Sequence, residues 1–257
     1  MSARNALARW LSPLGVSGSA LRGLRGYAWF FGDARRYRRM PGHTLPWGER
    51  WPMVLDRVGH TPFDAHYFYM DNWALRRVLG SGADWHVDVA SRVDTVAHMA
   101  ASMRVTFIDI RPLPAEVEGL ECRAGSVLDL PFPDQSVPSL SCLHVAEHVG
   151  LGRYGDPLDP QGTVKACKEL ERVLAPGGNL FFALPVGRPR VVFNAHRVHD
   201  PEDILRLFPE LALVEFSHVD DAGAFHRGSR PADAKELEYG CGMFWFTRTR
   251  KAKGARA

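Results

Sequence analysis

The stretch LERVLAPGGNLFFALP, residues 170–185, decides the fold class of this 257-residue chain. Leu170, Val173 and Leu174 recur at helical spacing and predict an amphipathic helix. Pro176-Gly177-Gly178 ends it, because proline cannot continue a helix and glycine accepts the left-handed cap. The apolar run 180–184 then predicts a buried strand. Helix, turn and buried strand in this order indicate an α/β crossover.

Strand-like and helix-like segments alternate on both sides of this crossover. We expect strands at 85–90, 105–110, 122–124, 139–145 and 180–184, helices at 63–79, 95–102, 163–174 and 201–208, and a final strand pair at 211–217 and 243–248. This alternation predicts a doubly wound, Rossmann-like α/β sheet, mostly parallel, with the last strand antiparallel. We expect an irregular N-terminal extension or lid at 1–60, the main domain at 61–248 and a basic tail at 249–257.

Charge is unevenly distributed along the chain. Residues 1–40 hold eight Arg and one Asp, and the residues from Arg248 onward add five basic groups. Because the whole chain carries +3, the remaining body is strongly acidic. An acidic body does not suit nucleic-acid binding. The four cysteines are well separated, without a CxxC pair, which favours reduced thiols in a cytoplasmic protein.

The N-terminal region combines aromatic and basic residues. The run Tyr27–Phe31 is too short to span a bilayer, and no signal peptide is evident. Flanked by arginines, it could rest on the inner face of a membrane as a peripheral contact. The alternative, which we favour, is a helix packed on the domain. The oligomeric state cannot be predicted.

The crossover at 170–185 and the segment GSVLDLPFPD at 125–134 resemble class I S-adenosylmethionine-dependent methyltransferases. In doubly wound sheets the ligand lies at the carboxyl ends of the strands. The resemblance implies that residues after the first three strands bind S-adenosylmethionine: Asp88, Ser91, Arg92, Asp109, Ser126 and Asp129, with His144 after the fourth.

Two of these positions need comment. Ala90, Arg92 and Asp94 stand where the superfamily has glycines, so Arg92 either meets the cofactor carboxylate or fills the site. Asp109 ends the second strand about twenty residues after this turn, where an acid can accept both ribose hydroxyl protons. A simple strand-end Asp is the alternative.

The segment LHVAEHV, residues 143–149, follows the fourth strand. His148 is the candidate general base, because imidazole accepts a proton near neutral pH. Glu147 either orients His148 or caps and packs the next helix. Asp156 is a further candidate base. A metal held by Glu147 and His148 lacks an evident third ligand, so we predict no metal site.

The strings EHVGLGRYGDPLDPQG (147–162), FDAHYFYMDNW (63–73), SRVD (91–94) and FNAHR (193–197) together resemble one uncharacterised branch of this superfamily, a domain of unknown function. Several relatives are assigned to surface-polysaccharide biosynthesis, which implies a sugar hydroxyl as acceptor. Polar and aromatic groups in the two loops are the expected substrate contacts: Arg153, Tyr154, Phe193, Asn194, His196 and Arg197.

The sequence therefore predicts a methyltransferase that O-methylates a glycan or another small hydroxylated acceptor. The alternative is a non-catalytic methyltransferase-like binding module in polysaccharide biosynthesis, whose glycine-free first turn excludes the cofactor. The two differ in one measurable property, the binding of S-adenosylmethionine.

Overall fold

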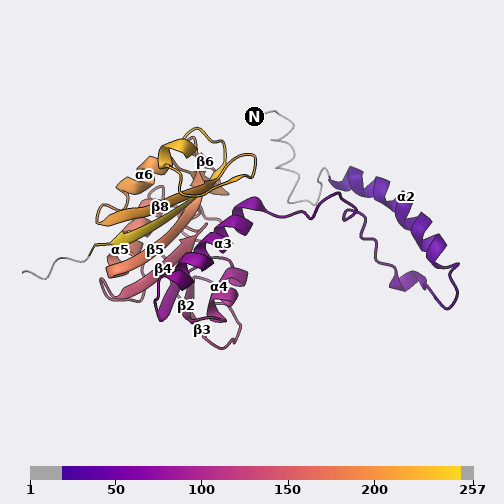
Figure 1. The fold of residues 1–257 in the computed structure, drawn as a ribbon, viewed down its shortest axis with the longest axis horizontal. Helices are drawn as coiled ribbons and strands as arrows, with labels where there is room; N and C mark the ends of the chain where they lie inside the picture. The colour runs from indigo at the N-terminus through magenta and orange to yellow at the C-terminus, as the bar shows by residue number, and fades with distance from the viewer. Residues whose placement is uncertain (1–18, 250–257) are drawn as a thin grey trace, which may run out of the picture. The chain divides into compact units, whose positions relative to one another are not determined.

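The computed structural model describes residues 19–249, which form two compact units, one up to Phe63 and one from Asp64 onward. The second unit is built on an eight-stranded sheet (Figure 1), with the strand order β3-β2-β1-β4-β5-β10-β8-β9. Its strands are β1 (Trp85–Val89), β2 (Arg104–Asp109), β3 (Leu120–Ala124), β4 (Val137–Leu143), β5 (Leu174–Val186), β8 (Leu211–Val219), β9 (Phe225–His226) and β10 (Gly240–Arg248).

The five strands from β3 to β5 pair in parallel, whereas β10 is antiparallel to both β5 and β8. The predicted fold class is confirmed: a mostly parallel, doubly wound α/β sheet with an antiparallel last strand. Because these strands are parallel, their carboxyl ends lie at one edge of the sheet, and the order in which strands are added reverses between β1 and β4, where ligands bind in such sheets.

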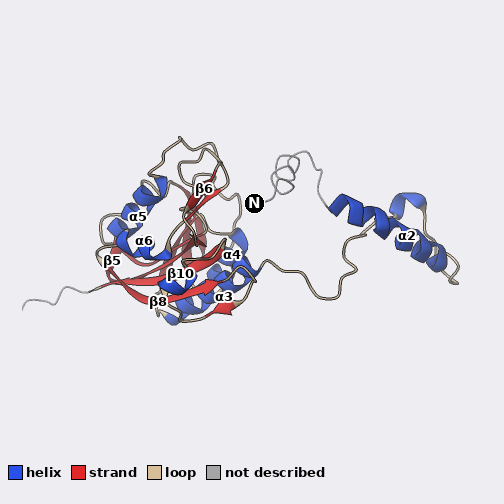
Figure 2. Ribbon diagram, turned by 90° about the horizontal axis from the view of Figure 1, so that it is seen from above, coloured by secondary structure: helices blue, strands red, loops and turns tan. Residues whose placement is uncertain are grey.

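Helices cover both faces of the sheet (Figure 2). The helices α5 (Gly162–Val173) and α6 (Pro201–Arg206) pack on one face, against side chains such as Leu180 and Phe182. The helices α3 (Ala65–Gly80) and α4 (Val93–Ala100) pack on the other, against Phe181 and Ala183. Successive residues of β5 thus point to opposite faces, which is why a fully buried strand is apolar throughout.

The PGG segment differs from its prediction. Helix α5 ends at Val173, and Pro176-Gly177-Gly178 lies within β5, where the register with β4 shifts. Gly177 has a φ of +79°, and a Cβ on Gly178 would lie 2.9 Å from the Pro138 carbonyl oxygen. Glycine is therefore required here by a bulge in the strand as well as by the end of the helix.

Several short elements, among them β9, were absent from the predicted pattern. The strands β6 (Arg190–Val192) and β7 (His196–Val198) form a separate hairpin, whose turn contains Phe193 and Asn194. A single turn of 3-10 helix, η3 (Pro231–Ala234), precedes β10. Strands of three residues carry too little periodicity to be recognised in a sequence.

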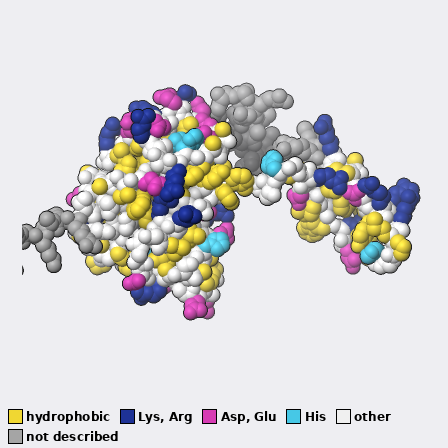
Figure 3. Space-filling model, viewed as in Figure 1, with side chains coloured by type: hydrophobic (Ala, Val, Ile, Leu, Met, Phe, Trp, Pro, Cys, Tyr) yellow, Lys and Arg dark blue, Asp and Glu magenta, His cyan; other side chains and the backbone are white. Residues whose placement is uncertain are grey.

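For the N-terminal unit the sequence suggested an irregular extension with a helix at the aromatic run, and the structure has a helix there. Helix α2 (Ser19–Tyr37) contains the aromatic run, and the 3-10 helix η2 (Trp47–Glu49) follows. Gly26 lies against Val54, and the Arg57 guanidinium lies 4.0 Å from the centre of the Trp29 ring. Figure 3 shows basic and apolar side chains exposed on this unit. None of the described helices is long and apolar enough to cross a membrane.

Candidate active site

A cavity of about 260 Å³ lies at the carboxyl ends of β1, β2 and β4. Its volume is near the lower end of the roughly 300–1,000 Å³ usual for small-molecule sites. Of the predicted site residues, six line it: Asp109, Ser126, His144, His148, Tyr154 and Asp156. Val89, Ala90, Val127 and Leu128 supply apolar walls.

The glycine-free first turn keeps a glycine-like backbone. Ala90 has a φ of +56°, and its N–H donates to the Ile108 carbonyl oxygen at 2.8 Å. The left-handed conformation costs a residue with a Cβ about 1–2 kcal/mol. Ala90 lines the cavity with this turn, so the missing glycine does not change the path of the backbone there.

Arg92 neither fills the cavity nor lines it. It is the N-terminal cap residue of α4, and its Nη2 donates to Asp94 at 2.9 Å. Its guanidinium lies 4.8 Å from the centre of the Tyr67 ring. The expectation that Arg92 fills the site is therefore wrong, and the cation stands beside the turn.

Asp88 and Ser91 support the turn from beneath. The Ser91 N–H donates to Asp88 Oδ1 at 3.0 Å, and Ser91 Oγ accepts from the Leu143 N–H at 3.1 Å. Ser141 donates to Asp88 and also contacts His86 Nε2 at 2.8 Å. Burial raises the pKa of Asp88 to about 6. Both residues were predicted to contact the cofactor, but their side chains bond within the turn and to Ser141 and Leu143 of β4, and neither lines the cavity.

Asp109 stands at the end of β2, 9% exposed, on the cavity wall. Its Oδ1 accepts from the Arg111 N–H at 2.7 Å, and no described residue donates to its Oδ2. Ser126 Oγ accepts from the Leu128 N–H at 3.1 Å and fixes the next loop. Asp129, predicted as a cofactor contact, is exposed and does not line the cavity.

His148 presents a basic nitrogen. Its Nδ1 lies 2.6 Å from the Ala195 carbonyl oxygen, which can only accept and therefore favours the neutral tautomer with the proton on Nδ1, although Arg153 Nη1 also lies 3.3 Å from this nitrogen. Nε2 is then unprotonated and lies 3.6 Å from Glu147 Oε1. Burial lowers the pKa of His148, and Glu147 opposes this shift. The neutral ring is therefore the resting form at neutral pH.

Glu147 is fully buried, and neither of its oxygens receives an aligned hydrogen bond from the described residues. Its Oε1 lies 3.2 Å from His144 Nδ1. Burial would raise the pKa of Glu147, but His144 and His148 outweigh it and lower that pKa. Glu147 does not line the cavity and so acts only through its neighbours.

His144 follows β4 with a φ of +55°, a strained conformation for a residue with a Cβ. Its Nε2 forms a hydrogen bond with Cys241 Sγ at 3.1 Å. Burial alone would lower the pKa of His144, but Cys241 and Glu147 outweigh it and raise the pKa well above its usual value. His66 lies nearby, with its ring centre 6.1 Å from that of His144.

The loop from Gly150 to Asp156 closes one side of the cavity. Asp156 accepts from the Gly150 N–H at 2.6 Å and from the Tyr154 N–H at 3.3 Å, and these bonds help to lower its pKa against the effect of burial. A lowered pKa and two backbone donors make Asp156 a loop-fixing residue and a poor base. Tyr154 lies against the Arg111 guanidinium, 4.4 Å from the ring centre.

Four of the six predicted substrate contacts lie on the β6–β7 hairpin or bond to it. Phe193 is 71% exposed at the tip of the β6–β7 hairpin, and Asn194 is also exposed. Arg153 donates to the Ala195 carbonyl oxygen at 3.0 Å, and the His196 ring lies 4.8 Å from that of Tyr239. None of these four lines the cavity.

Arg197 has a structural role that contradicts its predicted contact with substrate. It is 7% exposed and donates to the carbonyl oxygens of Val149 at 2.6 Å and Asp159 at 3.0 Å. These bonds tie both ends of the glycine-rich loop to β7. A guanidinium with these partners is not free to bind a substrate.

Sequence reasoning missed His66, Cys241 and Tyr239. They come from α3 and from the region around β10, far from the strand ends where site residues were sought. His66 lies within the string FDAHYFYMDNW, which was the one available signal. Cys241 had none, because a single cysteine in an apolar strand is usually a packing residue.

Comparison with known proteins supports the fold. Residues 136–223 match the family described as Caenorhabditis protein of unknown function, DUF268, a segment that runs from β4 to just before β9 and contains the 147–162 and 193–197 strings. Comparison with curated protein sequences gives no match.

Solved structures share the architecture at low identity. The cyclase SpnF superposes with a TM-score of 0.53 at 13% identity, covering 76% of this chain and 86% of its own. The N-methyltransferase NodS from Bradyrhizobium japonicum, in complex with S-adenosyl-L-homocysteine, gives 0.51 at 16% identity, covering 85% and 98%. The YcgJ protein from Bacillus subtilis gives 0.50 at 13%, covering 72% and 100%. The chain thus has a Rossmann-like methyltransferase fold.

Proposed function

We propose that this protein is an S-adenosylmethionine-dependent methyltransferase that acts on a hydroxyl of a glycan or another small hydroxylated acceptor. The observation that carries the proposal is one cavity lined both by Asp109 at the end of β2 and by His148 after β4. A ribose-binding acid and a candidate base thus face the same space. SpnF, a cyclase on this fold, is a reminder that the fold alone does not set the reaction.

The residues present fit the adenosine end of the cofactor. Asp109 Oδ2 is available to accept from the ribose hydroxyls, as in other doubly wound folds. Val127 and Leu128 offer apolar surface to the adenine ring, with Ser126 beside them. Ala90 brings the backbone of the first turn to the cavity, as a glycine would. When bound, S-adenosylmethionine would supply an electrophilic methyl group.

His148 is the residue that this chain offers for the acceptor proton. Its Nε2 is unprotonated in the neutral ring and can accept the proton of a hydroxyl as the oxygen becomes a nucleophile. Glu147 Oε1, 3.6 Å away, would stabilise the imidazolium that results. Holding acceptor and methyl donor in line supplies much of the remaining rate.

The rim of the cavity suits a polar ring. Tyr154 is 38% exposed and lies beside the arginines 111 and 153, and Phe193 projects from the nearby hairpin. An aromatic surface next to guanidinium donors is a common way to bind a sugar, since the ring C–H groups pack on the aromatic face while the hydroxyls accept from arginine. With a glycan as acceptor, the proposal extends to a role in polysaccharide biosynthesis.

Calorimetric titration with S-adenosylmethionine and S-adenosylhomocysteine tests the proposal. We expect micromolar affinity, about −7 to −8 kcal/mol. Absence of binding heat and of any thermal shift at millimolar cofactor would overturn it and favour a non-catalytic module whose cleft binds a glycan or partner.

The N-terminal unit supports a second, separate proposal: a peripheral contact with an anionic membrane. On α2 the side chains of Leu24, Tyr27 and Phe31 are exposed, together with Arg25 and Arg36. Apolar and cationic groups on one short helix suit a headgroup surface. Binding to vesicles of anionic lipid at low salt, lost at high salt, is the expected result. Intact protein that does not bind such vesicles at low salt would contradict this second proposal.

A further inference from the structure

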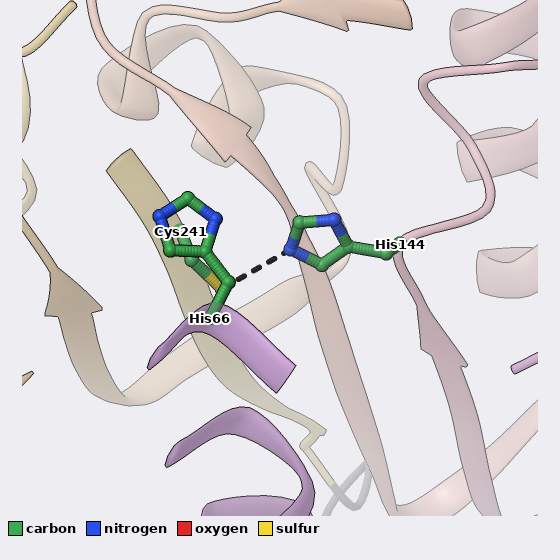
Figure 4. A group of neighbouring side chains, drawn as sticks. All are labelled: His66, His144 and Cys241. Carbon is green, nitrogen blue, oxygen red and sulfur yellow. Dashed lines mark hydrogen bonds between the residues drawn. The ribbon is translucent and has the colours of Figure 1, made fainter. Parts of the chain in front are cut away.

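Three side chains with metal-ligating atoms converge beside the cavity (Figure 4). His66 comes from α3, His144 follows β4, and Cys241 lies in β10. Each offers one ligand atom, and these atoms all lie within 4.8 Å of one another. Cys241 is fully buried and His144 is 9% exposed. The fold thus brings together donors that are up to 175 positions apart in the sequence.

Imidazole nitrogen and thiolate sulfur are the donors that zinc prefers in proteins. Zinc–nitrogen bonds of about 2.0–2.1 Å and zinc–sulfur bonds of about 2.3 Å place ligand atoms in a tetrahedral site roughly 3.3–3.8 Å apart. The present spacing, 3.1 Å between His144 Nε2 and Cys241 Sγ and at most 4.8 Å overall, lies close to this range. Small side-chain rotations would suffice to complete the site.

The ring of His144 is oriented as a zinc ligand requires. Its Nε2 faces Cys241, and its Nδ1 faces the Glu147 carboxylate at 3.2 Å. Histidine ligands usually give the second ring N–H to a carboxylate, which fixes the tautomer and leaves the lone pair on the nitrogen that meets the metal. The strained backbone of His144 is a further sign of a constrained position.

The charge of Glu147, whose nearest cationic partner is the His144 ring, also bears on a cation at this site. Glu147 is fully buried, and neither carboxylate oxygen has an aligned hydrogen bond among the described residues. A buried carboxylate is costly unless a positive charge compensates it. A divalent ion bound by one thiolate and two neutral imidazoles carries a net charge of +1, which would balance Glu147.

The same groups admit another interpretation, a Glu147–His144–Cys241 line that activates the thiol as a nucleophile. Two observations disfavour it. Cys241 is 0% exposed and does not line the cavity, so a substrate has no access to its sulfur. A nucleophilic thiol also leaves the proximity of His66 unexplained.

We propose that His66, His144 and Cys241 bind one Zn²⁺ ion, with Glu147 positioning His144. Three protein ligands leave one tetrahedral position for water or for an oxygen or sulfur atom of a substrate. The ion lies next to the cavity, because His144 lines it. This proposal does not rest on methyl transfer, and a failure to bind S-adenosylmethionine leaves it intact.

Cobalt and zinc titration of the full-length protein, freed of metal by a chelator, tests the site. We expect one equivalent of Co²⁺ to give visible bands of tetrahedral cobalt and a near-ultraviolet thiolate-to-cobalt charge-transfer band. Zn²⁺ should displace Co²⁺ and abolish both. Cys241→Ser should remove the charge-transfer band, and His66→Ala should weaken zinc binding.

Matched variants separate the site from general effects. Glu147→Gln keeps the three ligands and should weaken zinc binding about 10–100-fold, the usual effect of losing the carboxylate behind a histidine ligand. Cys122→Ser and His98→Ala replace a thiol and an imidazole outside the cluster and should leave spectrum and affinity unchanged.

Three results would overturn the proposal: no stoichiometric metal, a cobalt spectrum without the thiolate band, or unchanged affinity in Cys241→Ser. If Cys241→Ser does not fold, alkylation of the wild type decides, with the modified cysteines mapped by mass spectrometry. Zinc should protect Cys241 from alkylation, and equal labelling with and without zinc would contradict the site.

Discussion

The two sides of the candidate cleft are built in different ways. One side is formed by the short segments that follow β1, β2 and β3, with the polar groups Asp109 and Ser126 fixed by nearby backbone N–H groups. The other side gathers His66, His144, Glu147 and Cys241 from three distant segments around a buried charge. The first side arises from neighbouring strand ends, whereas the second depends on contacts between segments far apart in the sequence.

This difference indicates which side of the cleft determines the particular reaction. Backbone turns at the ends of parallel strands recur throughout doubly wound proteins and bind the part of a ligand that many enzymes share. Ionisable side chains brought together in a buried position recur much less and are costly to maintain. The predicted effects of substitution therefore differ in kind between the two sides.

The largest expected effect belongs to the histidine side. His148→Ala should lower turnover by about 10²–10⁴-fold, the usual contribution of a general base, and leave cofactor affinity unchanged. The measurement is release of S-adenosylhomocysteine with sugar-nucleotide acceptors, with cofactor binding measured in parallel. His98→Ala, an exposed histidine of α4, is the matched control. Full turnover in His148→Ala would move the role of base elsewhere.

Beneath the cofactor side, His86 should make stability depend on pH. It lies fully buried between the hydroxyls of Ser139 and Ser141, and burial lowers its pKa from 6.5 to about 3. Between these values the unfolded chain binds a proton that the folded chain does not, so stability falls as pH falls below 6.5. From about pH 6.5 to 5 the loss is about 2 kcal/mol.

Urea unfolding of wild type and His86→Gln at pH 7 and pH 5 measures this effect. The wild type should lose about 2 kcal/mol more than the variant over this interval. Asp88, whose raised pKa of about 6 has the opposite sign, contributes to both proteins and partly masks the change in each. His98→Gln should behave as the wild type. Equal losses in wild type and His86→Gln would contradict the prediction.

A smaller effect is expected from Asp109, the acid proposed to bind the ribose. Asp109→Ala should weaken binding of S-adenosylhomocysteine by about 1–3 kcal/mol, because the cofactor hydroxyls lose a charged acceptor. Calorimetry measures it, and Asp129→Ala, an exposed acid on the neighbouring loop, is the control. Unchanged affinity in folded Asp109→Ala would remove this residue from the site.

The smallest effect concerns the turn itself. Ala90→Gly relieves the left-handed strain of a Cβ but adds freedom to the unfolded chain, and these contributions nearly cancel. We expect a change in unfolding free energy below about 1 kcal/mol and no loss of cofactor affinity. A large loss of affinity would show that the Ala90 methyl group, and not only the backbone, contacts the ligand.

The sequence analysis placed residues of both sides on the cavity wall, but on the cofactor side only Asp109 and Ser126 of the proposed contacts line it. Asp109 and Ser126 could be placed because strand ends follow directly from apolar runs and turn residues. Asp88 and Ser91 were misjudged, because a strand-end position does not show whether a side chain points into the cleft or beneath the turn. Arg197 was misjudged because its partners, the Val149 and Asp159 carbonyl oxygens, are backbone atoms that leave no trace in residue types.

The histidine side required tertiary structure. His144 was identified from its place after β4, but its partners His66 and Cys241 belong to a helix before the sheet and to the last strand. No local pattern predicts that α3 and β10 meet at this point. The sequence could therefore indicate a third ligand of the proposed metal site only if it were already known that α3 and β10 lie next to each other.

The position of β10 has a consequence for biosynthesis. It is the last strand of residues 19–249, yet it lies inside the sheet, between β5 and β8. Until residues 240–248 have left the ribosome, β8 has no partner that joins it to the parallel strands, and β5 keeps an unpaired edge. The sheet of the nascent domain thus cannot be completed before residues 240–248 are available. A chain truncated before β10 would carry an open apolar edge at the centre of its sheet.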